Sequence, residues 1–202
     1  MKKLIFILLF TVFYSINVSA QKIFRDEAYG FSMDQPKDWL VGDNKTLMNN
    51  LSKVKMDEAA LAEVIKSNKG SLLLTSFYKY DIKTTAGLIP TIQVNLRSNP
   101  TKTFEQFYSA MSQSTAAFKN YFPDFKLLKE PTIIEINGIK AMYFIGAYTL
   151  GTAATGPMKV RSRTYVIPSA NFFFQLNFTD DQNKEDDTKL FDALVQSIKI
   201  GK

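Results

Sequence analysis

The chain contains no cysteine and no histidine among its 202 residues. Without histidine, a Ser-His-Asp catalytic arrangement is excluded. Without either residue, the chain lacks the conventional ligands of structural and catalytic zinc. Disulfide bonds are excluded as well, so we expect one large hydrophobic core to stabilise the fold. We predict no metal site, no cofactor and no catalytic residue.

Long apolar runs are also scarce, and the longest one lies at the N-terminus. Residues 1–3 carry two lysines, residues 4–14 are almost entirely apolar, and residues 18–20 are a valine followed by two small residues. This order is typical of a secretory signal peptide. A membrane span would need about twenty apolar residues. We therefore predict a signal peptide over 1–20 and one exported domain over 21–202, periplasmic or secreted.

Charge and motifs exclude further classes of protein. The net charge is +6, but no run of five or more basic residues exists, which argues against a nucleic-acid partner. The phosphate-binding patterns GxGxxG and GxxxxGK[ST] do not occur. Gln21 stands where a lipoprotein would need a cysteine. We therefore expect a soluble product without stable membrane insertion.

The hydrophobic pattern changes between strand and helix periods along the chain. Thr103 and Gln106 form a capping box at the start of a helix expected over 103–122. Asn137-Gly138 predicts a type I′ hairpin turn. The other expected elements are strands at 29–33, 39–41, 71–80, 89–97, 125–136, 139–150, 158–167 and 172–179, helices within 44–67, a flexible loop over 151–157, and a final helix carrying residues 190–198. This order predicts an α+β fold, an antiparallel sheet with helices packed on it.

Two stretches resemble a known superfamily. Residues 29–33 (Tyr-Gly-Phe-Ser-Met), followed by Pro36 and Trp39, resemble the opening of PsbP-like domains. The aromatic strands over 165–178 and the helix over 191–198 resemble the final hairpin and helix of that family. The resemblance implies a central antiparallel sheet with helices on both faces, an α/β/α sandwich. Members such as PsbP of photosystem II and DcrB-type envelope proteins are mostly non-enzymatic binding or assembly factors, which implies no catalytic motif here.

A row of basic residues is one candidate site. Lys159, Arg161 and Arg163 alternate along one expected strand, so they project from one sheet face together with Tyr165. Guanidinium groups match carboxylates and phosphates, and the row could contact a small anionic ligand or a protein partner in the cell envelope. The favoured alternative is a solvated or snorkelling row.

Two other clusters have structural interpretations that we favour. The acidic stretch over 180–187 is rich in calcium-type oxygen ligands, but it lacks the EF-hand spacing and glycine. It stands before a helix, where acids complement the dipole and supply the cap. Phe104, Phe107, Tyr108 and Phe118 could line an aromatic groove, but their spacing is that of a buried helix face. In the expected meander, the acids and the 151–157 loop share one end of the sheet.

These observations predict an exported, soluble accessory or binding protein without catalytic activity, whose ligand or partner the sequence does not identify. One alternative is a hydrolase that uses paired carboxylates, which must face each other across a substrate. The other is a structural partner in an envelope complex, which would expose a large apolar patch.

Overall fold

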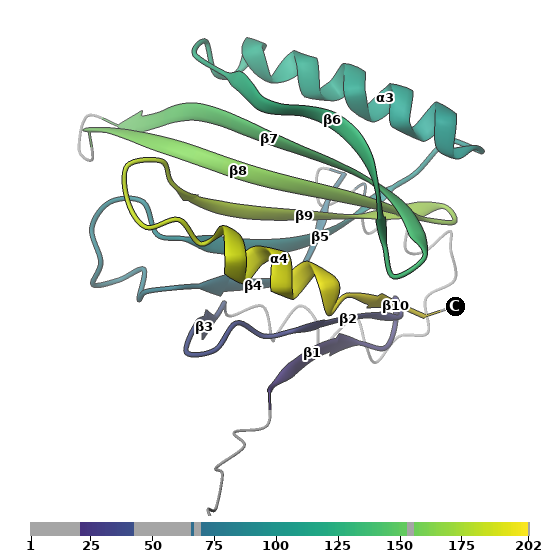
Figure 1. Cartoon of the computed structure of the whole chain (residues 1–202), viewed down its shortest axis with the longest axis horizontal. Helices are drawn as coiled ribbons and strands as arrows, with labels where there is room; N and C mark the ends of the chain where they lie inside the picture. Colours follow the sequence, from purple (N-terminus) through teal and green to yellow (C-terminus); the bar gives the residue numbers. More distant parts are fainter. Residues whose placement is uncertain (1–20, 43–65, 67–69, 153–155, 202) are drawn as a thin grey trace, which may run out of the picture.

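The computed structural model describes residues 21–42, 66, 70–152 and 156–201. Within them, seven strands form an antiparallel sheet in the order β3-β4-β5-β9-β8-β7-β6 (Figure 1). These strands are β3 (Leu40–Val41), β4 (Leu72–Tyr78), β5 (Thr91–Ser98), β6 (Lys126–Ile136), β7 (Ile139–Thr152), β8 (Gly156–Ser169) and β9 (Phe172–Asp181). The predicted antiparallel sheet is therefore confirmed.

Strands β6 to β9 form the predicted four-stranded meander. Asn137 and Gly138 connect β6 to β7 with φ angles of 48° and 83°. Positive φ at both central residues is what a type I′ turn requires. Strand β5 completes the central part of the sheet by pairing with β9, which is distant in the sequence.

A second, smaller sheet joins the two ends of the described chain. Its order is β1 (Ile23–Asp26), β2 (Phe31–Asp34) and β10 (Lys199–Ile200). Strands β1 and β10 were not predicted from the sequence, because each has fewer than five residues and little alternation. Phe31 of β2 is fully buried, and its ring lies 5.0 Å from that of Phe174, so the small sheet covers part of the main core.

Helix α3 (Phe104–Ala116) begins where the capping box predicted, and the 3-10 turn η1 (Ala117–Asn120) continues it. The Thr103 hydroxyl accepts a hydrogen bond from the Gln106 amide at 3.2 Å. The Gln106 side chain accepts a hydrogen bond from the backbone N–H of Lys102. In a full capping box it would accept from the N–H of the N-cap residue, Thr103. Phe107 packs in a core cluster with Met142, Phe144, Val166 and Phe173.

Helix α4 (Thr188–Gln196) packs on the main core cluster through Phe191, Leu194 and Val195. The Phe191 ring lies 5.1 Å from that of Phe178. Its N-cap residue, Asp187, makes no side-chain capping bond. The cap predicted from the acidic stretch comes instead from Asp186, whose carboxylate accepts from the Thr188 amide at 2.9 Å. The helices expected within 44–67 lie outside the described residues, apart from Lys66 alone.

Two expectations at one end of the sheet are wrong. The loop expected over 151–157 is shorter, because Gly151 pairs with Pro157 and Thr152 with Gly156 in the β7–β8 ladder. Strand β9 ends opposite Val160, so the missing N–H of Pro157 faces no strand. Residues 153–155, the centre of that loop, are outside the described residues. Asp180 and Asp181 belong to β9 and not to the segment that precedes α4.

Candidate functional site

The basic row predicted on β8 lies on one sheet face, and its members become more buried from the sheet end inward. The side chain of Lys159 is 51% exposed, that of Arg161 17% and that of Arg163 2%. Lys159 donates to the Thr149 hydroxyl at 2.9 Å and lies 3.8 Å from Asp124. The row is therefore neither uniformly solvated nor uniformly buried.

Arg161 and Arg163 share the carboxylate of Asp180, which is fully buried on the neighbouring strand. Arg161 is paired directly with Asp180 in the β8–β9 register and donates two hydrogen bonds to it, at 2.8 and 2.9 Å. Arg163 donates to the same carboxylate at 3.1 Å. Both arginines also contact Asp186, at 3.1 and 2.9 Å. This cluster fastens the segment before α4 to the sheet.

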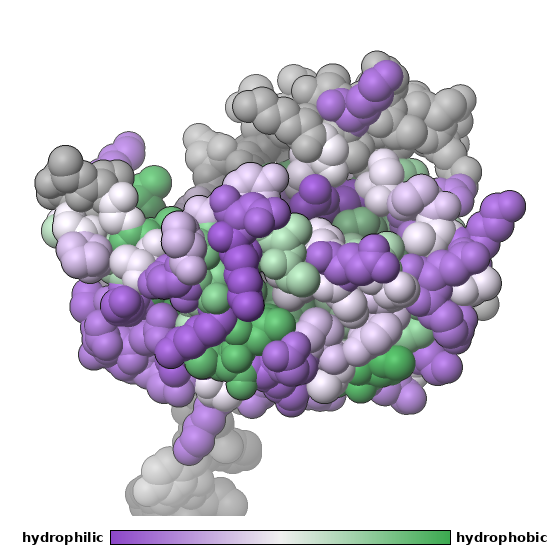
Figure 2. Space-filling view, turned by 90° about the horizontal axis from the view of Figure 1, so that it is seen from above, coloured by the Kyte–Doolittle hydropathy of each residue, from purple (hydrophilic) through white to green (hydrophobic). Residues whose placement is uncertain are grey.

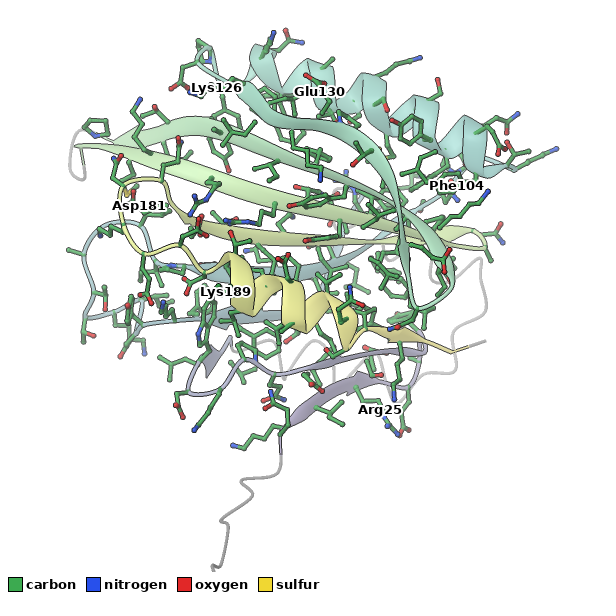
Figure 3. All side chains as sticks on the ribbon, viewed as in Figure 1. Arg25, Phe104, Lys126, Glu130, Asp181 and Lys189 are labelled. Carbon is green, nitrogen blue, oxygen red and sulfur yellow. The ribbon has the colours of Figure 1, made fainter. Side chains whose placement is uncertain are left out.

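Two other acids of the 180–187 stretch bind a lysine, Lys79, which directly follows β4. Lys79 donates to Glu185 and to Asp187, both at 2.7 Å. Burial disfavours the charge of Lys79, but these two carboxylates outweigh it and raise the Lys79 pKa. Hydrogen bonds from Thr188 and the charges of Arg161 and Arg163 lower the pKa of Asp186 against a partial burial effect. Figure 3 shows the labelled Asp181 and Lys189 at this end of the molecule, where β9 gives way to α4.

These contacts decide between the two interpretations of residues 180–187. Among the described residues, no group of three or more Asp or Glu side chains is arranged to hold a metal ion. Asp180 and Asp186 instead form ion pairs with arginine guanidinium groups, and Asp187 forms an ion pair with a lysine ammonium group. The structural interpretation of this stretch accounts for the contacts observed.

A separate cleft of about 680 Å³ lies between α3 and the sheet. We call it the α3 cleft. Its apolar lining comes from Met111 on α3, Phe118 on η1, Phe144 on β7 and Phe173 on β9. The hydrogen-bonding lining comes from the sheet and from the C-terminal part of α3: Arg97, Ser98, Ser114, Thr115, Thr164 and Gln175. Cavities of about 300–1,000 Å³ with mixed linings of this kind are typical of small-molecule sites.

Hydrogen-bonded side chains from three neighbouring strands run across the sheet beneath the cleft. The guanidinium of Arg97 on β5 donates a hydrogen bond to the side-chain amide oxygen of Gln175, Oε1, at 3.2 Å. Gln175 donates in turn to Asn177 at 3.3 Å, and Thr164 on β8 donates to Asn177 at 3.2 Å. Polar side chains in the middle of a sheet face need partners when they are buried. This chain of bonds therefore fixes their positions beside the cavity.

The cleft continues into a smaller cavity of about 180 Å³ toward the sheet end. Phe118, Phe144, Thr164 and Gln175 line both cavities. Phe125 also lines the smaller cavity. Its ring stacks on that of Phe118, with the ring centroids 5.4 Å apart. The aromatic groove considered for α3 is thus present only in part, because Phe118 borders a cavity whereas Phe107 is 2% exposed in the core.

Arg97, Gln175 and Asn177 were not among the site residues predicted from the sequence. A signal was present, because polar residues alternate with buried apolar ones along both strands: Gln93, Asn95 and Arg97 on β5, and Gln175 and Asn177 on β9. What the sequence lacked was the pairing of β5 with β9, which places the two polar rows side by side.

A third concavity, of about 500 Å³, lies between α4 and strands β6 and β7. Tyr143 and Tyr165 stack there with ring centroids 4.4 Å apart, and the Lys129 ammonium lies 4.9 Å from the Tyr143 ring. Burial, and then the neighbouring Tyr143, raise the pKa of Tyr165. Burial raises the pKa of Tyr143 as well, so both tyrosines are neutral at pH 7.

The surface gives little support to a large apolar docking patch on the face that Figure 2 shows. There, hydrophobic residues form separate small groups surrounded by hydrophilic ones. The exposed large apolar residues of the described chain are also dispersed over several elements, for example Leu128 and Ile133 on β6, and Tyr121 after η1. Singly exposed apolar residues of this kind are normal for a protein surface.

Comparison with solved structures identifies the fold. The solution structure of the cyanobacterial PsbP protein CyanoP from Synechocystis sp. PCC 6803 is similar with a TM-score of 0.57 and 11% identity, covering 93% of this chain and 96% of that chain. A crystal structure from Bacteroides thetaiotaomicron VPI-5482 is similar with a TM-score of 0.52 and 12% identity, covering 90% of this chain. The present chain spans 49% of that second protein.

Comparison of the sequence itself gives no further assignment. No family model matches it, and no curated protein matches it. At 11–12% identity, the structural likeness is evidence for the fold alone. The chain has a PsbP-like fold, as the resemblance of its opening and closing segments indicated.

Proposed function

We propose that this chain is an exported, non-catalytic binding protein and that its ligand occupies the α3 cleft. The observation that carries the proposal is the cleft itself, which combines an apolar side from α3, η1 and the sheet with a fixed hydrogen-bonding side from β5, β8 and β9. A cavity with a few convergent polar groups is the usual form of a ligand site. The PsbP-like fold, which we infer to be an α/β/α sandwich, supports the proposal only as an analogy.

The carboxylate hydrolase is the weaker alternative. Its acids would come from residues 180–187, and Asp180, Asp186 and Asp187 are held by arginine or lysine side chains at the sheet end. The described residues that line the α3 cleft include no Asp or Glu. A glycosidase-type reaction would need two carboxyls facing each other across a substrate.

Binding in the cleft can be tested with a neutral apolar fluorophore, N-phenyl-1-naphthylamine. We expect residues 21–202 to enhance its fluorescence, and Ser114→Trp to abolish the enhancement by filling the cleft. Ser114 lines the cleft from an exposed position on α3. The matched control is Ser109→Trp, at an exposed position on the same helix outside the lining. Equal binding by the two variants would refute the proposed site, and so would failure of the parent chain to bind both this fluorophore and, by calorimetry, dodecanoate.

Export is a separate part of the proposal, and it depends on the signal-like order of residues 1–20. Among the described residues, no helix combines the length and apolar character that crossing a membrane requires. Mass measurement of the native product is expected to give a chain that starts at Gln21. A retained N-terminus would contradict the assignment, and so would a lipid adduct.

The ligand or partner contacts predicted for Lys159, Arg161 and Arg163 remain a prediction. Their internal ion pairs support a structural role for Arg161 and Arg163, whereas the exposure of Lys159 leaves its ammonium accessible. Affinity capture from the native envelope, followed by mass spectrometry, would identify a protein partner if one exists.

A further inference from the structure

We infer that the α3 cleft is selective for an amphipathic anion, whose apolar part packs on Met111, Phe118 and Phe173 while its charged head group binds Arg97. This inference rests on the proposed function and adds to it the chemical class of the ligand. Three observations support it: Arg97 has no carboxylate partner among the described residues, the described charges that line the cleft are positive, and apolar and polar groups lie on different parts of the lining.

Arg97 differs from Arg161 and Arg163, the two arginines on β8, in the groups that its guanidinium binds. Arg161 and Arg163 each bind two carboxylates, Asp180 and Asp186. Arg97 is half-buried on β5, and its one described partner is a neutral amide, the side chain of Gln175. No acidic residue of the described chain forms an ion pair with it. A guanidinium has five N–H donors, so Arg97 retains donors for a ligand.

Among the residues that the structure describes, the charges that line the cleft have one sign. Lys66 and Arg97 are the charged residues among its described lining, and both are positive. A half-buried positive charge without a carboxylate partner is unfavourable. An anion that brings its own carboxylate or phosphate would supply the missing partner, and a guanidinium binds either group through paired hydrogen bonds. A cationic ligand would be repelled.

The apolar groups determine the rest of the ligand. Met111, Phe118, Phe144 and Phe173 come from four different elements and border the same cavity as Arg97. Methionine and phenylalanine side chains pack well against alkyl chains, and burial of each methylene group in such a lining is favourable. A small hydrophilic anion would leave this surface in contact with water. A ligand with an alkyl or aromatic portion and one anionic head fits both parts of the lining.

The test compares ligands with one chain and different heads, by displacement of N-phenyl-1-naphthylamine below their micelle-forming concentrations. The probes are dodecanoate, dodecyl phosphate, dodecanol and dodecyltrimethylammonium. We expect at least one anion to displace the fluorophore at about tenfold lower concentration than dodecanol, because hydrogen bonds between two charged groups are stronger than those of a neutral hydroxyl. The tighter of the two anions identifies the preferred head group.

The variant Arg97→Gln should remove the preference for the anions while dodecanol binding is retained, and Arg97→Lys should retain part of the preference. Arg25→Gln is the matched control, because Arg25 is exposed on β1 and does not line the cleft. If Arg97→Gln does not fold, judged by circular dichroism, the comparison of dodecanoate with dodecanol on the parent chain still decides.

The outcomes separate the two proposals. Equal displacement by dodecanol and both anions would overturn the anion preference and leave the cleft as a binding site. An anion preference that survives in Arg97→Gln would also overturn the role of Arg97. Failure of the fluorophore to bind the parent chain, together with no binding of dodecanoate by calorimetry, would refute the binding function itself.

Discussion

Arg163 and Asp180 form an ion pair inside the protein, with the Arg163 Nη1 atom 3.1 Å from the Asp180 Oδ2 atom. Their side chains are 2% and 0% exposed. The Arg163 guanidinium also lies 5.2 Å from the centre of the Phe191 ring, so it packs between the sheet and α4. The pair therefore connects β8, β9 and the last helix at one place.

Replacing both arginines tests whether this cluster is structural. Arg161→Ala with Arg163→Ala leaves the buried Asp180 carboxylate without an ion-pair partner, with only the backbone N–H of Asp187, among the described residues, donating to it. Stranding a buried charge in this way typically costs about 3–5 kcal/mol. We expect chemical denaturation, followed by circular dichroism, to show a loss of this size. Lys159→Ala, on the same row but 51% exposed, should change stability by less than about 1 kcal/mol.

The same variants test the predicted partner contacts. Affinity capture from the native envelope should give the same proteins for the double variant as for the parent chain if the arginines are structural. Unchanged stability with lost capture would instead make Arg161 and Arg163 partner contacts, contrary to the role inferred from their ion pairs.

Asp186 should contribute to stability in a pH-dependent way. Its pKa is lowered by hydrogen bonds from Thr188 and by Arg161 and Arg163, so the folded state favours the charged form. The contribution is therefore present above the unfolded pKa of about 3.9 and is lost as the pH falls through the lower folded value. Asp186→Asn should destabilise the protein at pH 7 and have a smaller effect as the pH falls below 4.

Denaturation curves of parent and variant between pH 3 and pH 7 measure this dependence, with Glu27→Gln, an exposed carboxylate before β2, as the control. A difference between parent and Asp186→Asn that stays constant down to pH 3 would mean that charge is not the source of the effect.

Tyr29 should make the protein sensitive to alkaline pH. Burial, and then the charge of Asp26, raise the pKa of Tyr29 to about 12. The unfolded chain loses this proton near pH 10, so the folded state is progressively destabilised between pH 10 and pH 12. In Tyr29→Phe this part of the loss should be absent, and stability measured from pH 9 to pH 12 should fall less steeply than in the parent.

At pH 7 the same substitution should cost little. The Tyr29 hydroxyl is buried and has no hydrogen-bond partner among the described residues. Removing an unsatisfied buried polar group is neutral or stabilising, so we expect a change within about 1 kcal/mol of the parent. A loss of more than about 2 kcal/mol would mean that the hydroxyl has a partner in solution.

The predictable and unpredictable parts of this fold have different physical origins. The Asn137-Gly138 turn and the N-cap of α3 at Thr103 are set by local backbone chemistry, and both were predicted to the residue. Strand β10 owes its pairing to β2, about 170 residues earlier in the chain, which no local pattern contains. The α3 cleft was missed for the same reason, since Arg97 and Gln175 meet only because β5 pairs with β9.

Gly146 should be required by the aromatic packing beside the cleft. A Cβ atom at this position would lie 2.7 Å from Cε2 of Phe125, closer than side chains in proteins approach. Phe125 is buried and stacks on Phe118, so it has little room to move. Overpacking of this kind typically costs about 1–3 kcal/mol, and we expect that loss for Gly146→Ala in denaturation experiments.

Gly146→Ala should also change the shape of the α3 cleft, because a displaced Phe125 ring pushes on Phe118, which lines the cleft. Binding of N-phenyl-1-naphthylamine should weaken in Gly146→Ala under conditions where the variant is still folded. Gly201→Ala is the matched control, since its Cβ would meet other atoms only at an ordinary distance of 3.6 Å. Equal stability of the two variants would show that Phe125 can move aside, and unchanged fluorophore binding would separate its ring from the cleft.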